Sequence, residues 1–196
     1  MRSSLLVLGG ARSGKSRHAQ AAAGQAGLTL DVQRLALLGG LGLVVLGITA
    51  SLQPPHPPGA MDFPLQPTLD KIGKDRWADA YLWRTLVEAG APVAFASDWP
   101  VTDVSVLRGL QAALTRQPYA GATDERLSLM DSLYAYTAGG AWAAQMDDIT
   151  GRLVPGLAAD LVLIDGDLEA VAAEEIGAMS VALTICGGRI THRAGI

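Results

Sequence analysis

The sequence predicts an α/β fold, and three stretches of the chain carry that prediction. Residues 4–27 run from a short apolar stretch through a glycine-rich loop into an Ala-rich helix, which is how a strand–turn–helix unit of a parallel sheet begins. The amphipathic stretch 75–89 is followed at once by the apolar stretch 92–96, which makes a second unit of helix and strand. Residues 153–196 change to short apolar runs separated by turn residues, which indicates a small β-rich piece.

Length and composition narrow the classes of protein that remain. The 196 residues are 49% hydrophobic and 17% charged, which is too apolar for intrinsic disorder. The chain is shorter than the roughly 250 residues of a complete (β/α)₈ barrel. Because 15 basic and 19 acidic residues give a net charge of −4, we expect no nucleic-acid partner. The single cysteine excludes a disulfide framework and a multi-cysteine metal site.

One apolar stretch, residues 35–52, is long enough to be weighed as a membrane span. It carries no charge, but four glycines interrupt it. A buried helix end followed by a buried strand of a parallel sheet explains the same pattern. The apolar run at the N-terminus is too short for a secretory signal. We therefore expect a cytoplasmic protein without membrane contact.

The middle of the chain predicts a strand, a loop, a helix and a second strand in that order. Residues 43–52 form a buried strand, and residues 53–67 form a loop because so many prolines fit neither a helix nor a central strand. Residues 75–89 form one amphipathic helix that ends at Gly90. The apolar residues 92–96 then form a short strand.

The next stretch predicts two helices. The first covers residues 104–115, and the second covers residues 129–137. Ser128 and Asp131 have the spacing of a capping box that opens this second helix. The pair Gly139-Gly140 is expected to break it.

The β-rich tail is predicted from its turns. Pro155-Gly156 and Asp165-Gly166 are turn dipeptides. Gly187-Gly188 is a two-residue hairpin signal. Strands are therefore expected over residues 160–164, 181–186 and 189–192.

The N-terminal loop matches the phosphate-binding pattern G-x-x-x-x-G-K-[ST] in full, between the strand and the helix that this pattern requires. In such a loop the backbone N–H groups surround a phosphate, Lys15 reaches the β- and γ-phosphates, and Ser16 holds Mg²⁺. ATP or GTP with Mg²⁺ is therefore a candidate ligand, and a glycine-rich turn that matches by chance is the alternative. The predicted nucleotide-binding residues are Gly9, Gly10, Ser13, Gly14, Lys15 and Ser16.

The opening LLVLGGARSGKSRHAQ resembles the start of the bifunctional adenosylcobinamide kinase/adenosylcobinamide-phosphate guanylyltransferase of cobalamin synthesis. The resemblance covers residues 1–27. It implies a nucleotide-binding fragment of a kinase or guanylyltransferase. The family's remaining sheet, its second acidic motif and its guanylylated histidine region have no counterpart downstream.

Asp98 comes directly after the predicted strand 92–96, in the stretch Ala-Ser-Asp-Trp-Pro. Polar groups at this end of barrel strands carry catalysis. A carboxylate in this place can bind a metal or take a proton from a metal-bound water. An Asx-turn or a helix cap is the alternative use of the same residue.

Four segments, VAFASDWPV, SLQPPH, AYTAGGA and GRLVPGLAADLVLIDGD, together resemble the C-terminal third of the metal-dependent amidohydrolases. The subgroup is amidohydrolase family 3, which contains the N-substituted formamide deformylases, and the resemblance covers residues 31–196. It implies an incomplete TIM barrel, made of the last strands and helices, with a small β-sandwich tail. The predicted domains are a phosphate-loop segment, a partial barrel and a β-rich tail, over residues 1–27, 28–152 and 153–196.

By that resemblance, Asp98 matches the aspartate at the end of the eighth barrel strand, which is a metal ligand and a proton shuttle. It is the predicted catalytic and metal-binding residue. Gln53 and His56 match the loop after the seventh strand and, with Trp99, are predicted to contact substrate. A solvated loop position for His56 and a packing role for Trp99 are the alternatives. The resemblance implies a divalent metal, zinc, and a small amide-like substrate.

The metal ligands decide what activity we expect. The sequence has no His-x-His pair, and catalytic zinc normally keeps three protein ligands and a water. His18 or His192 would have to join Asp98 and His56. We therefore expect hydrolysis of non-peptide C–N bonds by ancestry, with this chain inactive on its own. A nucleotide-binding fragment of cobalamin synthesis and a non-catalytic fusion remnant are the alternatives, and exposed barrel edges predict self-association.

Overall fold

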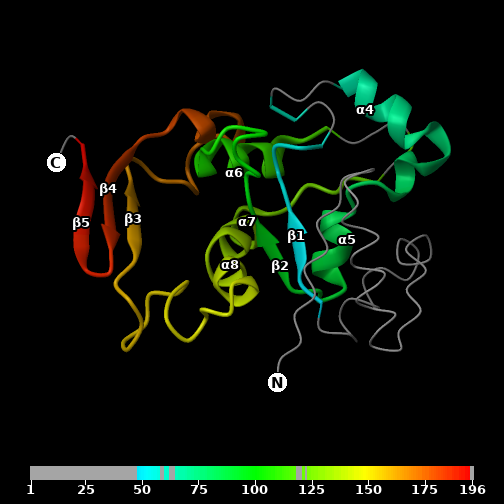
Figure 1. Cartoon of the computed structure of the whole chain (residues 1–196). Coiled ribbons are helices and arrows are strands. Elements are labelled where there is room, and N and C mark those ends of the chain that lie inside the picture. The colour runs from blue at the N-terminus through cyan, green and yellow to red at the C-terminus, as the bar shows by residue number, and fades with distance from the viewer. Residues whose placement is uncertain (1–47, 58–59, 62–64, 118–120, 122, 195–196) are drawn as a thin grey trace.

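The computed structural model describes residues 48–57, 60–61, 65–117, 121 and 123–194. Over these residues the chain forms a two-stranded parallel sheet and a three-stranded antiparallel sheet (Figure 1). In chain order the elements are β1 (Ala50–Leu52), α4 (Leu65–Ile72), the 3₁₀ helix η1 (Lys74–Asp79), α5 (Trp83–Glu88), β2 (Val93–Phe95), α6 (Val106–Thr115), α7 (Leu129–Tyr136), α8 (Ala138–Ala143), β3 (Leu161–Ile164), the 3₁₀ helix η2 (Ala173–Ala178), β4 (Val181–Cys186) and β5 (Arg189–Arg193).

Some of the sequence predictions fall outside the described residues. The predicted strand at residues 4–8, the phosphate loop and residues 35–47 of the long apolar stretch lie there. Among the helices that the structure describes, none has the length and apolar character needed to cross a bilayer.

The parallel sheet joins β1 to β2, with Leu52 opposite Phe95. The connection between the two strands passes through α4, η1 and α5, the kind of crossover that parallel strands need. All three residues of β2 are buried, and α8 lies against this strand. Because the strands are parallel, the loops that follow them leave the sheet at the same edge. Helices α4 and α6 lie on that side (Figure 1).

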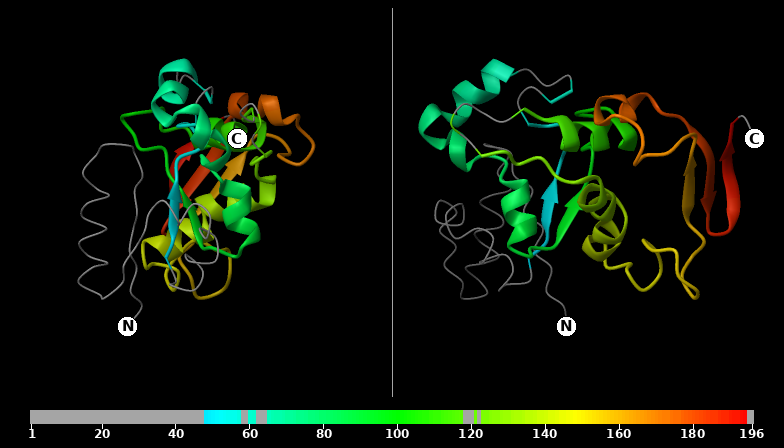
Figure 2. Two further views of the ribbon diagram at one scale, coloured as in Figure 1. Left: turned by 90° about the vertical axis from the view of Figure 1, so that its right-hand side faces the viewer. Right: turned by 180° about the vertical axis from the view of Figure 1, so that it is seen from behind.

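An aromatic core packs β2 between α5 and α7. The rings of Trp83 and Phe95 lie 5.9 Å apart, and those of Phe95 and Tyr136 lie 5.1 Å apart. A second cluster, formed by Leu107, Leu110 and Ile176, joins α6 to η2. Helices α6, α7 and α8 therefore lie between the two sheets (Figures 1 and 2).

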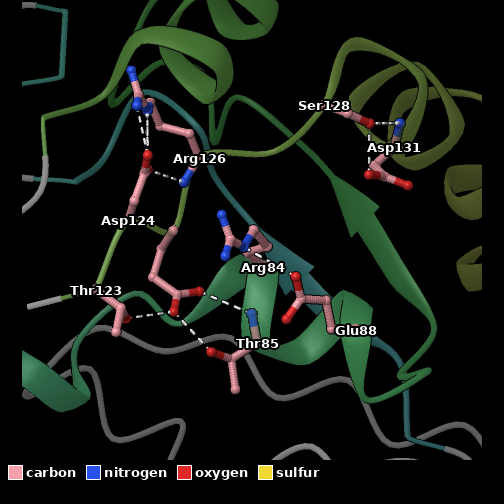
Figure 3. Close-up of polar contacts among 9 residues, drawn as sticks. Arg84, Thr85, Glu88, Thr123, Asp124, Arg126, Ser128 and Asp131 are labelled. Carbon is pink, nitrogen blue, oxygen red and sulfur yellow. Dashed lines mark hydrogen bonds and ion pairs between the residues drawn. The ribbon is translucent and has the colours of Figure 1, made fainter.

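Several local predictions are confirmed. The hydroxyl oxygen of Ser128 accepts a hydrogen bond from the Asp131 N–H at 3.1 Å, and α7 begins at the next residue (Figure 3). Gly187 and Gly188 link β4 to β5 with φ of 55° and 77°, the positive values that a two-residue hairpin turn requires. The predicted strands at 92–96 and 160–164 appear as β2 and β3.

The single helix predicted over residues 75–89 is wrong. The structure has η1 and α5 instead, separated by Tyr81 at a φ of 59°. Tertiary contacts hold the break: the indole N–H of Trp77 donates to the Leu69 carbonyl at 3.1 Å, and the guanidinium of Arg116 donates to the Tyr81 carbonyl at 2.9 Å. An amphipathic pattern contains no signal for either contact.

Two other boundaries differ from the prediction. Helix α4 starts at Leu65, inside the predicted loop 53–67, and contains Pro67. Pro67 lies in the first turn, where the helix does not use the backbone N–H that proline lacks. Of the strand predicted over residues 43–52, only Ala50–Leu52 belong to β1 among the residues that the structure describes.

The predicted break at Gly139-Gly140 is also wrong, because both glycines lie inside α8. The change of direction occurs at Thr137, where φ is −115° and ψ is −92°. Gly139 lies against β2 so closely that a Cβ atom at this position would overlap the carbonyl oxygen of Val93. The glycine therefore permits close packing of α8 on the sheet.

A buried carboxylate caps α5 from a distant part of the chain. The N-cap residue of α5, Leu82, makes no capping hydrogen bond with its side chain. Glu125, which is 4% exposed, accepts hydrogen bonds from the Thr85 N–H at 2.9 Å and from the Thr85 hydroxyl at 2.7 Å. The Thr123 hydroxyl also donates to this carboxylate, at 2.9 Å (Figure 3). The segment before α7 is thereby fixed to α5.

In the antiparallel sheet the strands are ordered β3-β4-β5. Asp160, just before β3, accepts hydrogen bonds from the Thr150 hydroxyl and from the Gly187 N–H, both at 2.6 Å. These two hydrogen bonds hold the pKa of Asp160 below its usual value, and the bond from the Thr150 hydroxyl has the larger effect. The carboxylate thus connects the segment after α8 to the hairpin turn of the tail.

Candidate active site at the ends of β1 and β2

Asp98 lies in a tight turn just after β2, with a positive φ of 59°. Its carbonyl accepts a hydrogen bond from the Val101 N–H at 2.8 Å. The Ser97 hydroxyl oxygen accepts from the Trp99 N–H at 3.2 Å, and the Thr102 hydroxyl donates to the Ser97 carbonyl. These hydroxyl groups support the turn, and the sequence analysis did not single them out. Hydroxyl residues on both sides of an aspartate after a strand are the signal that indicates such a turn.

His56 lies in the loop that follows β1. Its N–H donates to the Gln53 carbonyl at 3.0 Å, and the Gln53 amide donates to the Ser51 hydroxyl at 3.2 Å. Three buried prolines surround His56 in sequence and restrict the backbone of this loop. They are Pro54, Pro55 and Pro57.

The structure brings His56 and Asp98 together. The Nε2 atom of His56 lies 3.8 Å from the Oδ2 atom of Asp98, and their side chains are 18% and 52% exposed. Burial lowers the pKa of His56, and the charge of Asp98 opposes that shift to a smaller extent. The imidazole is therefore neutral at pH 7. The pair combines a carboxylate that solvent can approach with an imidazole held in a stiff loop.

The other residues predicted for this site are placed differently. Trp99 follows Asp98 and is 68% exposed, so it does not pack in the core. His192 lies on β5, where its Nε2 atom is 3.1 Å from the Val181 carbonyl oxygen. It belongs to the antiparallel sheet and does not join Asp98. His18 lies outside the described residues.

The number of ligands that a catalytic zinc needs decides whether this pair forms a complete metal site. Asp98 and His56 offer oxygen and nitrogen donors, which zinc accepts, but a catalytic zinc keeps three protein ligands. Over the part of the chain that the structure describes, no group of three or more His, Cys, Asp or Glu side chains could hold a metal ion. The described residues therefore do not fit a whole catalytic zinc site.

Comparison with known proteins assigns the chain to a family. The sequence pattern of the amidohydrolase family matches residues 43–192. The chain belongs to the amidohydrolase family. Its family match covers β1, β2 and the turn with Asp98, so the candidate site lies within the amidohydrolase part of the chain.

Curated relatives are much longer than this amidohydrolase chain. Protein LONG AFTER FAR-RED 3 of Arabidopsis thaliana is 34% identical over 149 residues, which cover 74% of this chain and 25% of that protein. The putative amidohydrolase YtcJ of Bacillus subtilis is 29% identical over 139 residues, 68% of this chain and 26% of that protein. The chain thus spans about a quarter of the length of these relatives.

Solved structures support the same fold. An amidohydrolase from Thermotoga maritima matches with a TM-score of 0.57 and 19% identity over 99% of this chain and 44% of that one. An adenosine deaminase from Xanthomonas campestris with bound zinc matches with a TM-score of 0.55 and 17% identity over 88% of this chain and 42% of that one. At these identities the likeness shows the fold alone, which is the TIM-barrel-like α/β fold of amidohydrolases.

The residues predicted to bind nucleotide all precede the part of the chain that matches the family. They lie outside the described residues, and the family match begins after them, at residue 43. The residues concerned are Gly9, Gly10, Ser13, Gly14, Lys15 and Ser16.

Proposed function

We propose that this chain is the C-terminal third of an amidohydrolase and that it contributes to a site that hydrolyses a non-peptide C–N bond in a small amide-like molecule. The observation that supports the proposal is the pairing of His56 with Asp98 where two adjacent parallel strands end. Active-site groups of barrel enzymes lie at this end of the strands. Membership in the family makes the chain a hydrolase by ancestry.

In this proposal Asp98 moves the proton. Its exposed carboxylate takes a proton from the attacking water while the water oxygen bonds to the carbonyl carbon, and it returns that proton to the nitrogen as the C–N bond breaks. The carboxylate is then ionised again. The neutral imidazole of His56 holds the water or the substrate by a hydrogen bond. Gln53 and Trp99 offer an amide and an exposed apolar ring to the substrate.

A divalent metal, zinc, is the cofactor that the family suggests. When bound, zinc polarises a carbonyl and lowers the pKa of a bound water. Asp98 and His56 supply two donors, so further ligands have to come from outside the described residues. The sequence alone predicts an inactive chain, but because His56 and Asp98 lie together we propose slow turnover by this chain alone when zinc is added.

Replacing Asp98 tests the proposal directly. With zinc added, we expect the full chain to hydrolyse N-formyl amines slowly and Asp98→Asn to lower the rate by about 100-fold or more, because the amide cannot accept the proton. Zinc affinity, measured by calorimetry, is expected to fall at least about tenfold in Asp98→Asn and in His56→Ala. The matched control is Asp148→Asn, at an exposed aspartate far along the chain. Equal hydrolysis by Asp98→Asn and the unaltered chain would contradict the proposal.

The phosphate loop is the basis for a second candidate function, nucleotide binding, because it matches the pattern in full and its flanking residues predict the strand and the helix that the pattern needs. We expect Mg-ATP at about 100 times its Kd to stabilise the full chain by about 2.7 kcal/mol in a thermal melt. Lys15→Ala should remove this shift because Lys15 would contact the phosphates. Lys74→Ala, at an exposed lysine outside the loop, is the control. An equal shift in both variants would assign the nucleotide to another surface.

A further inference from the structure

The turn after β2 holds Asp98 in a backbone conformation that residues with a side chain normally avoid. Its φ of 59° lies in the left-handed region. There the Cβ atom comes close to the following carbonyl oxygen, so such a residue keeps this conformation only when its surroundings support it. The Cβ atom has a fixed position relative to the backbone N and C atoms of its own residue. Whatever holds φ of Asp98 positive therefore also sets the direction of its carboxylate.

The contact with His56 does not by itself fix that direction. The Oδ2 atom of Asp98 lies 3.8 Å from the Nε2 atom of His56, which is longer than a hydrogen bond. The Asp98 side chain is also 52% exposed, so close packing does not confine it. The Asp98 carbonyl accepts a hydrogen bond from the Val101 N–H at 2.8 Å, which holds the peptide group that follows Asp98. The peptide group that precedes Asp98 needs a support of its own.

The side chain of Thr102 supplies this support. Its hydroxyl donates a hydrogen bond to the Ser97 carbonyl, which belongs to the peptide group that joins Ser97 to Asp98. The φ torsion of Asp98 is the rotation between this peptide group and the rest of the residue. A donor that holds the Ser97 carbonyl in one orientation therefore holds φ of Asp98 as well.

The chain on both sides of this hydrogen bond is anchored. Before the turn, the Ala96 N–H donates to the Leu52 carbonyl at 3.0 Å and so continues the pairing of β2 with β1. After the turn, the Asp103 carboxylate accepts a hydrogen bond from the guanidinium of Arg108, in α6, at 2.6 Å. Thr102 is half-buried and directly precedes Asp103. Its hydroxyl thus connects the end of β2 to the start of α6.

We propose that Thr102 is a positioning residue for Asp98. Without its hydroxyl, the peptide group between Ser97 and Asp98 rotates, and φ of Asp98 returns to the negative range that is less strained. The Cα–Cβ bond of Asp98 turns with it, and the carboxylate moves away from His56. Asp98 moves the proton in the function proposed above, and the effect of Thr102 on the reaction rate rests on that function.

Nuclear magnetic resonance tests the support of Asp98 without zinc or substrate. The amide and α protons of one residue lie closer together at positive φ than at negative φ, so the nuclear Overhauser effect between them is stronger. We expect a strong effect at Asp98 in the unaltered full chain and in Thr102→Ser, which keeps the hydroxyl. We expect Thr102→Val to lose this strong effect. Thr102→Ala removes the same hydroxyl and takes the place of Thr102→Val if that variant does not fold, as judged by circular dichroism.

Thr115→Val is the matched control for this experiment. The Thr115 hydroxyl also donates to a carbonyl, that of Gln111 at 2.7 Å, and Thr115 is also half-buried. It lies at the other end of α6, so its loss should leave the strong effect at Asp98 unchanged.

Hydrolysis of N-formyl amines with zinc added tests the consequence for the reaction. We expect Thr102→Val to lower kcat about tenfold or more with little change in KM, because a misplaced catalytic group slows the reaction without weakening substrate binding. Thr102→Ser and Thr115→Val should keep kcat within about twofold of the unaltered chain.

Two results would overturn the proposal. The first is a strong effect at Asp98 that persists in Thr102→Val, because the turn would then keep its conformation without the hydroxyl. The second is an unchanged kcat in Thr102→Val in a chain whose kcat Asp98→Asn lowers. If no form of the chain hydrolysed the substrate but the resonance pattern were as expected, the proposed function would be contradicted and the support of Asp98 by Thr102 would stand.

Discussion

Replacing Gly139 by alanine is expected to lower the free energy of unfolding by about 3 kcal/mol. The added Cβ atom would overlap the carbonyl oxygen of Val93, a backbone atom of β2 that cannot move aside without distorting the strand. Helix α8 would have to move away from the sheet that carries Asp98 at its end. Urea denaturation followed by circular dichroism measures the change.

Gly140→Ala is the matched control for this prediction. At that position in the same helix, the nearest atom to an added Cβ is the Ala135 carbonyl oxygen, at 3.7 Å, which is an ordinary contact. Alanine also favours a helix over glycine by about 1 kcal/mol, so Gly140→Ala should be neutral or slightly stabilising. Equal destabilisation by the two substitutions would mean that the close contact between α8 and β2 is not what selects glycine at 139.

Glu125→Ala is expected to lower the free energy of unfolding by about 2 to 4 kcal/mol. The substitution removes three hydrogen bonds to a charged group, from the Thr85 N–H, the Thr85 hydroxyl and the Thr123 hydroxyl, and bonds of this kind contribute about 1.5 to 3 kcal/mol each. Because Thr85 and Thr123 are exposed residues, water replaces part of that loss. The bond from the Thr85 N–H is the cap of α5, and a helix cap alone is worth about 1 kcal/mol. Urea denaturation measures the change: the midpoint should fall while the slope of the unfolding free energy against urea concentration stays the same.

Glu88→Ala provides the comparison within the same helix. Glu88 forms a surface ion pair with Arg84, and its side chain is 64% exposed (Figure 3). Exposed pairs of this kind contribute about 0.5 kcal/mol or less. If Glu125→Ala were as mild as Glu88→Ala, the long-range cap would not be what holds the start of α5.

The features that the sequence predicted correctly depend on neighbouring residues. Ser128 and Asp131 interact within one helical turn, and the turn at Gly187-Gly188 depends on two glycines. The position of Asp98 after a strand followed from local pattern together with the family resemblance. Its proximity to His56 could not be predicted from spacing, because it depends on the parallel pairing of β1 with β2.

The features that the sequence did not predict depend on distant residues. The break at Tyr81 is held by Arg116, and the cap of α5 is supplied by Glu125, which lies 40 residues after Thr85. Gly139 is a helix breaker by propensity, yet its lack of a side chain is what lets α8 pack on β2. In each case a tertiary contact outweighs the preference of the local sequence.

Strand pairs that are close together along the chain are expected to form before pairs that are far apart. Strands β4 and β5 are joined by two residues, and a hairpin of this kind forms in about 1 to 10 μs. Strand β1 finds β2 only after the chain has passed through α4, η1 and α5, and the entropy cost of closing a loop rises with its length. The β4–β5 hairpin can therefore form early, whereas His56 and Asp98 come together only after the longer connection between β1 and β2 has closed.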